Sequence, residues 1–143
     1  MAYEKIVVAL AGERDERSVV HEAVRLAGAV NAHLTVLHVN DPAAGKTTMM
    51  MEAEPLVTES DIQKMFVDLG YLDQASKMKV DVRIGASLPK EIASATEGSD
   101  LLDIGHRRKN RFLAALADAA DKHLADMVSC PVLIVPRSEN HDG

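Results

Sequence analysis

Aromatic residues and cysteine are scarce in this chain. Among 143 residues there are two tyrosines, two phenylalanines and no tryptophan, so aliphatic side chains and methionine must fill the interior. The single cysteine, Cys130, excludes an intramolecular disulfide and fits a reducing compartment. Its apolar setting beside Pro131 predicts a buried structural thiol rather than a reactive one.

Long apolar segments and excess positive charge are also lacking. No stretch approaches the roughly 20 apolar residues that span a bilayer, and the apolar run in MAYEKIVVAL is too short for a signal peptide. The formal net charge of −6 argues against general binding to nucleic acid, whose phosphates favour basic surfaces. We therefore expect a cytoplasmic protein with neither a membrane nor a nucleic acid as its partner.

The chain alternates between strand-like and helix-like segments. Five short apolar runs predict strands that are covered on both faces: Ile6–Leu10, Leu34–Val39, Val80–Ile84, Leu101–Ile104 and Val132–Val135. Apolar residues at helical spacing predict helices between them: Asp15–Asn31, Asp61–Lys77 with Thr58 or Ser60 as its cap, Pro89–Thr96, and a stripe from Leu113 to Met127.

This alternation requires right-handed crossovers and a parallel sheet. We predict a single α/β domain over residues 1–136, with an open five-stranded, Rossmann-like sheet in the order 3-2-1-4-5 and helices on both faces. Residues 41–57 form a flexible insertion in this prediction, and residues 137–143 form a disordered tail.

Ligands of such sheets bind at the switch point, outside the carboxyl ends of the first and fourth strands. The segments to inspect are therefore Ala11–Gly12 and Gly105–Arg111. Most glycines that would cradle a phosphate there are replaced. The basic run His106–Arg111 either attracts an anion at the switch point or is a solvated loop, and the sequence leaves both interpretations open.

The sequence gives little support for a phosphate loop or a metal site. Gly45-Lys46-Thr47 matches the end of a phosphate loop, but Asn40 stands at the first glycine position and no helix pattern follows, which favours a plain flexible loop. The histidines are scattered and do not predict a metal site. His38, inside a strand, is interpreted as a satisfied, partly buried imidazole.

The segments IVVAL, LTVLHV, DLLDIGHRR and CPVLIVP, in this order and spacing, resemble the universal stress protein family over nearly the whole chain, apart from the insertion and the tail. The opening MAYEKI and the GH dipeptide are similar to the UspA-type branch. The resemblance implies a non-catalytic, cytoplasmic stress-response protein that acts as a homodimer and through protein partners.

Members of that family that hold ATP carry an aspartate after the first strand and G-x2-G-x9-G-[ST] after the fourth. This chain has Ala11 in place of the aspartate; Gly105 is kept, and Arg108, Asp118 and Ala119 replace the rest. An arginine side chain fills space that glycine leaves open, and an aspartate repels a triphosphate. We therefore predict no tight ATP binding and no cofactor. The vestigial nucleotide site comprises Ala11, Val39, Gly105, Arg107, Arg108, Asp118 and Ala119.

Three further hypotheses remain. The basic loop with Arg107 and Arg108 defines the alternative function, a nucleotide-binding (ATP or AMP) switch or weak ATPase. The Met49–Met51 triplet suggests an adaptor that engages a partner through soft side chains. The last strand would be an unpaired edge unless a second copy covers it, which predicts a dimer edge at Val132, Leu133, Ile134 and Val135.

Overall fold

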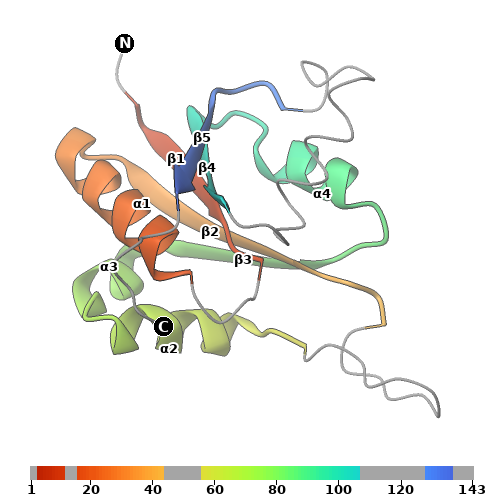
Figure 1. Ribbon diagram of the computed structural model, residues 1–143, viewed down its shortest axis with the longest axis horizontal. Helices are drawn as coiled ribbons and strands as arrows, with labels where there is room; N and C mark the ends of the chain where they lie inside the picture. Colours follow the sequence, from red (N-terminus) through yellow and green to blue (C-terminus); the bar gives the residue numbers. More distant parts are fainter. Residues whose placement is uncertain (1–2, 12–15, 44–55, 107–127, 137–143) are drawn as a thin grey trace.

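The computed structural model describes residues 3–11, 16–43, 56–106 and 128–136. They form one parallel five-stranded sheet in the order β3-β2-β1-β4-β5, as Figure 1 shows, so the predicted α/β fold and strand order are confirmed. The elements are β1 (Lys5–Ala9), α1 (Arg17–Val30), β2 (His33–Asn40), α2 (Glu59–Asp68), α3 (Leu72–Lys77), β3 (Lys79–Ile84), α4 (Leu88–Ala95), β4 (Leu101–His106) and β5 (Val132–Pro136).

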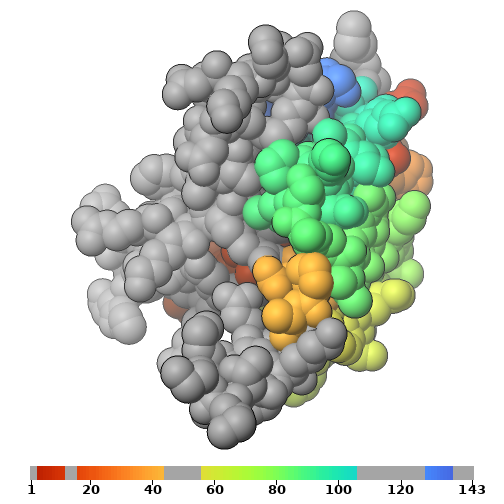
Figure 2. All heavy atoms as spheres, turned by 90° about the vertical axis from the view of Figure 1, so that its right-hand side faces the viewer, coloured from red at the N-terminus to blue at the C-terminus, as the bar shows by residue number. Residues whose placement is uncertain are grey.

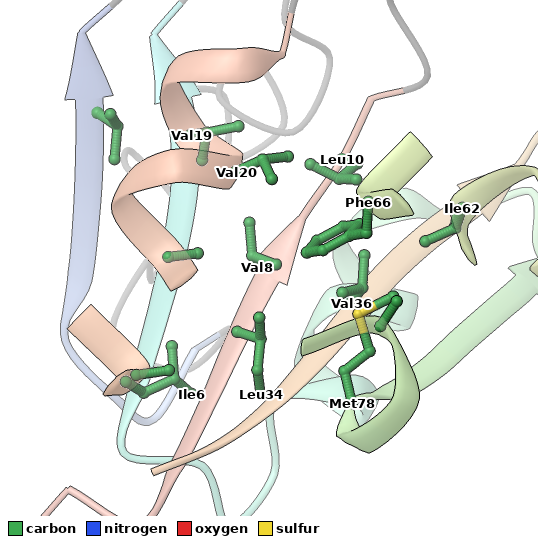
Figure 3. Close-up of a cluster of buried hydrophobic side chains, with 14 of the residues drawn as sticks. Ile6, Val8, Leu10, Val19, Val20, Leu34, Val36, Ile62, Phe66 and Met78 are labelled. Carbon is green, nitrogen blue, oxygen red and sulfur yellow. The ribbon is translucent and has the colours of Figure 1, made fainter. Parts of the chain in front are cut away.

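The central strands are apolar on both faces because each face carries its own core. On one face, side chains of α1, α2 and α3 pack against alternate residues of the strands, with Phe66 fully buried near the middle (Figure 3). On the other face, Ile92 and Ala95 of α4 pack against Val7, Leu37 and their neighbours. This two-sided burial is the reason for the continuous aliphatic runs of β1, β2 and β4.

Local signals set the ends of the helices. Thr58 caps α2, as predicted: its hydroxyl accepts the N–H of Asp61, and the Asp61 carboxylate accepts the N–H of Thr58. These hydrogen bonds lower the pKa of Asp61. Helix α1 ends at Asn31, which adopts the left-handed conformation with φ 57° that commonly terminates helices.

The prediction of one helix over Asp61–Lys77 is wrong, because the chain forms two helices there. Gly70 has a φ of +93°, which glycine adopts without strain and which ends α2. Ala75 of α3 is buried in the same core cluster as Phe66, whereas Leu72 is 64% exposed and not on the apolar face. The helix expected over Leu113–Met127 and the tail 137–143 lie outside the described residues, as does most of the insertion.

None of the helices in the described ranges is long and apolar enough to cross a membrane.

Candidate ligand site at the carboxyl edge of the sheet

The sheet brings three of the predicted site residues to one edge. Ala9 at the end of β1 pairs with Leu37 of β2 and with Ile104 of β4, so Ala11, Val39 and Gly105 follow on three adjacent strands. We call these residues, with Leu10 and Asn40, the switch-point edge. Val39 is buried, and Ala11 and Gly105 are half-buried. The other predicted members, Arg107, Arg108, Asp118 and Ala119, lie outside the described residues.

Two buried polar side chains hold the peptide group between Leu10 and Ala11. Nδ1 of His38 lies 2.7 Å from the carbonyl oxygen of Leu10, and the N–H of Ala11 donates to Oε2 of Glu16 at 2.7 Å. His38 is 3% exposed and Glu16 is 6% exposed. Both polar groups of this peptide are therefore bound by the chain's own side chains.

Glu16 binds the first amide after β1 that the sheet does not use. The N–H of Leu10 donates to the carbonyl of Leu37 on β2, and the next N–H, that of Ala11, donates to the Glu16 carboxylate. Glu16 also lines a cavity together with residues of α2. A ligand that approached the Ala11 amide would therefore meet this carboxylate.

Asn40 ties the end of β2 to the segment that enters α2. Its Nδ2 donates to the carbonyl of Val57 at 2.8 Å, and its Oδ1 accepts the N–H of Val57 at 3.0 Å. This pairing fixes the orientation of the amide, so Oδ1 is the atom that lies 3.2 Å from Nε2 of His38.

Both ring nitrogens of His38 therefore face oxygen acceptors. A neutral imidazole has one N–H donor, which either of these oxygens can accept. The interpretation of His38 as a satisfied imidazole is confirmed, with deeper burial than the sequence indicated. Glu16 and Asn40 were not identified from the sequence, although Glu16 stands among the acidic residues before α1.

The side of the edge that faces α4 is apolar, with an ionic group next to it. Ala11 and Leu88 pack against the buried cluster that contains Val39. On β3, Arg83 contacts Asp81 at 3.1 Å and Glu91 of α4 at 3.5 Å, and hydrogen bonding to Asp81 is the main cause of its raised pKa. Figure 2 shows the end of β2 (orange) beside the segment that carries β3 and α4 (green).

Gly85, which follows β3, leaves room for the side chain of Glu91. A Cβ atom at this position would lie 2.6 Å from Cγ and from Oε2 of Glu91, so this flexible side chain would have to shift. The glycine lets Glu91 lie over the end of β3 and reach Arg83. Its carboxylate and that of Asp81 neutralise Arg83, so this side offers a surface suited to a flat apolar group rather than to a phosphate.

A second buried acid lies deeper in the sheet. Asp103 of β4 is 0% exposed, and neither of its carboxyl oxygens has a hydrogen-bond partner in the part of the chain that the structure describes. Burial raises its pKa to about 7, with a further contribution from the negative charge of Glu22 on α1. The sequence held the signal, an aspartate inside the apolar run LLDIG, but we did not single it out.

A cavity of about 370 Å³ lies between the start of α1 and α2. Its floor includes Met65 and Leu69, and its charged lining combines basic and acidic side chains from both helices. Within the described ranges, no three His, Cys, Asp or Glu side chains cluster closely enough to hold a metal ion. The lining residues are Glu16, Arg17, Asp61, Lys64, Met65, Asp68 and Leu69.

Cys130 is half-buried and packs against the apolar cluster under α4. Burial raises the pKa of its thiol, which keeps the sulfur in its unreactive protonated form. This agrees with the structural role predicted from the sequence, although the burial is incomplete.

Comparison with known proteins identifies relatives over the whole domain. The model of the universal stress protein family matches residues 2–136. A curated relative from Escherichia coli K12, universal stress protein D, is 26% identical over 148 aligned residues, which cover 93% of this chain and 99% of the relative.

Solved structures share the fold at lower identity. Universal stress protein UspA from Lactobacillus plantarum has a TM-score of 0.63 and 19% identity, covering 94% of this chain and 99% of its own. A universal stress protein in complex with cAMP has a TM-score of 0.60 and 23% identity, covering 96% and 100%. One from Archaeoglobus fulgidus in complex with dAMP has a TM-score of 0.57 and 18% identity, covering 94% and 99%.

Proposed function

The chain belongs to the universal stress protein family, and from this premise we propose a non-catalytic, cytoplasmic stress-response protein of the UspA type. In this proposal it acts as a homodimer and through protein partners, and it does not bind ATP tightly. The resemblance of its first and fourth strands to the UspA-type branch supports the assignment.

The observation that carries the proposal is that side chains of this chain bind both the carbonyl and the N–H of the peptide group between Leu10 and Ala11. Members of the family that hold ATP carry an aspartate where this chain has Ala11. Here the N–H of Ala11 binds the buried carboxylate of Glu16, and the neighbouring carbonyl binds His38. A ligand at this point would have to displace a short hydrogen bond to a charged group, which costs roughly 1.5–3 kcal/mol.

The sequence after β4 supports the same conclusion. Gly105 is kept, but Arg108, Asp118 and Ala119 replace two glycines and a hydroxyl residue of the ATP pattern. Loss of two or three charge-assisted contacts, at roughly 1.5–3 kcal/mol each, weakens binding by several orders of magnitude.

Calorimetric titration of the whole chain with ATP, ADP, AMP and cAMP tests this function. We expect no heat of binding at micromolar concentrations of any of the four. Micromolar ATP affinity that is lost in the double variant Arg107→Ala/Arg108→Ala would instead establish the alternative, a nucleotide-binding switch or weak ATPase that uses the basic loop.

One feature of the edge favours that alternative for smaller nucleotides. The apolar surface of Ala11 and Leu88, which pack against the buried cluster that contains Val39, suits the face of a purine, and related folds have been solved with cAMP and with dAMP. A monophosphate needs fewer phosphate contacts than ATP does. Binding of AMP or cAMP without binding of ATP would therefore assign the site to monophosphates.

The proposed dimer forms through β5. Among the described strands, β5 is an edge strand that pairs with β4, and its side chains Leu133 and Ile134 are 36% and 44% exposed. Exposed apolar residues on an unpaired edge strand invite pairing with a second copy across a two-fold axis. Val135 is 7% exposed and belongs to the core, so it would contribute its backbone rather than its side chain.

We expect Leu133→Asp and Ile134→Asp to convert the dimer into a monomer, because a carboxylate would be buried at the paired edge without a partner. Light scattering coupled to size exclusion measures the mass. The matched control is Ile84→Asp, which alters an exposed apolar residue on β3 at the other edge of the sheet. A dimer that survives both β5 substitutions would contradict this interface.

A further inference from the structure

Asp103 is enclosed by apolar groups on the face of the sheet that α1 covers. Its register partners are Val8 on β1 and Leu133 on β5, and partners in a parallel sheet point to the same face. Val8 lies in the core cluster with Val19 and Val20 of α1, which point toward the sheet beside it in Figure 3. Water is excluded from both carboxyl oxygens, and no described group donates a hydrogen bond to them.

Few charged groups among the described residues lie near Asp103. On the face that it shares, the neighbouring residues of β1, β4 and β5 are Ile6, Val8, Leu10, Leu101, Gly105, Leu133 and Val135, none of which is titratable. On α1, the group whose charge acts on Asp103 is Glu22, which is half-buried and paired with the exposed Arg25. His21, also on α1, is exposed and contacts Tyr71 instead.

Among the described residues, an ionised carboxylate in this position would have no hydrogen-bond donor to compensate its burial, and the charge that acts on it, that of Glu22, has the same sign. Such a group either takes up a proton or drives the packing apart until water reaches it. The described structure is therefore the one that fits the neutral acid.

Of the two strand residues that flank Asp103, the one on β5 lies on the strand that separates more easily from β4. Strand β1 is hydrogen-bonded on both sides, whereas β5 is bonded only to β4, and its Leu133, which flanks Asp103, is already 36% exposed. Separation of β5 from β4 would hydrate Asp103 while the inner strands stay paired. Local openings of this kind are common at sheet edges and need less free energy than global unfolding.

We propose that Asp103 is a proton-operated latch for β5: the neutral acid holds α1, β4 and β5 closed, and the carboxylate favours a locally opened state in which β5 separates from β4. Because burial raises the pKa of Asp103 to about 7, the latch responds near neutral pH. The inference goes beyond the proposed function and does not depend on nucleotide binding; pairing of β5 with a second copy would oppose the opening.

Amide hydrogen exchange of the full chain, followed by NMR from about pH 5.5 to about pH 8.5, tests the latch. After correction for intrinsic exchange rates, the opening constant of the β5 amides should rise about tenfold per pH unit up to about pH 7, roughly thirtyfold in all, and then level off. Amides of Val36 and Leu37 in β2, which exchange only when the whole domain unfolds, should have much smaller opening constants at every pH, because separation of β5 leaves β2 paired on both sides. In Asp103→Asn the β5 amides should lose this pH dependence.

The proposal is overturned if Asp103→Asn keeps the pH dependence of the wild type, or if the opening constants of the β5 amides are no larger than those of the β2 amides, which would mean that β5 opens only when the whole domain unfolds. A second measurement needs no variant: the carboxyl ¹³C resonance of Asp103 in the wild-type protein should titrate near pH 7. A midpoint near that of an ordinary aspartate, about 4, would also refute it.

Discussion

Replacing Asp103 with asparagine should raise the free energy of unfolding at pH 8 by about 4 kcal/mol. The folded-state pKa is about 7 against 3.8 for an unperturbed aspartate, so between these values the folded chain holds a proton that the unfolded chain has released. Stability therefore falls by about 1.4 kcal/mol per pH unit from about pH 4 to pH 7 and is level above. Asparagine keeps the size and the neutral polar character but removes this titration.

Urea unfolding of the two proteins at a series of pH values measures the difference. The two curves should meet near pH 4 and diverge up to pH 7. Asp68→Asn, an exposed position on α2, is the control and should change stability by less than about 0.5 kcal/mol. Curves for the wild type and Asp103→Asn that stay parallel from pH 4 to pH 8 would contradict the prediction.

Asp100 and Asp61 change the pH dependence of stability in the opposite direction, and they do so only at lower pH. Hydrogen bonds from the backbone N–H groups of Glu4 and Lys5 lower the pKa of Asp100. Its contribution is present above its unfolded pKa, near 4, and is lost as the pH falls through the folded value. Asp61 behaves in the same way. The wild type should therefore be most stable in mild acid.

Restoring the family's ATP pattern should create ATP affinity in this chain. The quadruple variant Ala11→Asp/Arg108→Gly/Asp118→Gly/Ala119→Ser supplies the missing carboxylate, both glycines and the hydroxyl, and it removes one carboxylate that would repel a triphosphate. Two regained charge-assisted contacts, at roughly 1.5–3 kcal/mol each, correspond to about two to four orders of magnitude in Kd. Calorimetric titration with ATP measures the gain.

Two partial variants serve as controls. Ala11→Asp alone restores only the residue after β1, and the triple variant at 108, 118 and 119 restores only the segment after β4. Each should bind more weakly than the quadruple variant, since the contacts lie on both sides of the switch point. Equal ATP affinity in the wild type and the quadruple variant would show that these substitutions are not what limits binding.

Much of the fold could be predicted from the sequence because the patterns that determine it lie within short segments of the chain. The aliphatic runs of β1, β2 and β4 need two covered faces, and the right-handed crossover then limits the strand order. Thr58 with Asp61 forms a helix start within four residues. The break at Gly70 was missed because apolar spacing continues across it, and only the backbone conformation shows the turn.

The polar interior required the tertiary structure. Glu16, Asn40 and Asp103 lie far apart in the sequence, and each looks like an ordinary polar residue there. Their roles depend on what the fold places next to them: the amide of Ala11, the backbone of Val57, and for Asp103 no partner among the described residues. Hydrogen bonding and desolvation are set by neighbours in space.

By itself, the sequence determined the α/β class, the strand order, the family and the replacement of its ATP residues, because hydrophobic periodicity, chirality and residue identity are properties of the chain. Only the tertiary structure decided that the peptide after β1 is closed by Glu16 and His38 and that Asp103 is buried without a partner, because the energy of a polar group depends on the solvent and donors that folding leaves around it.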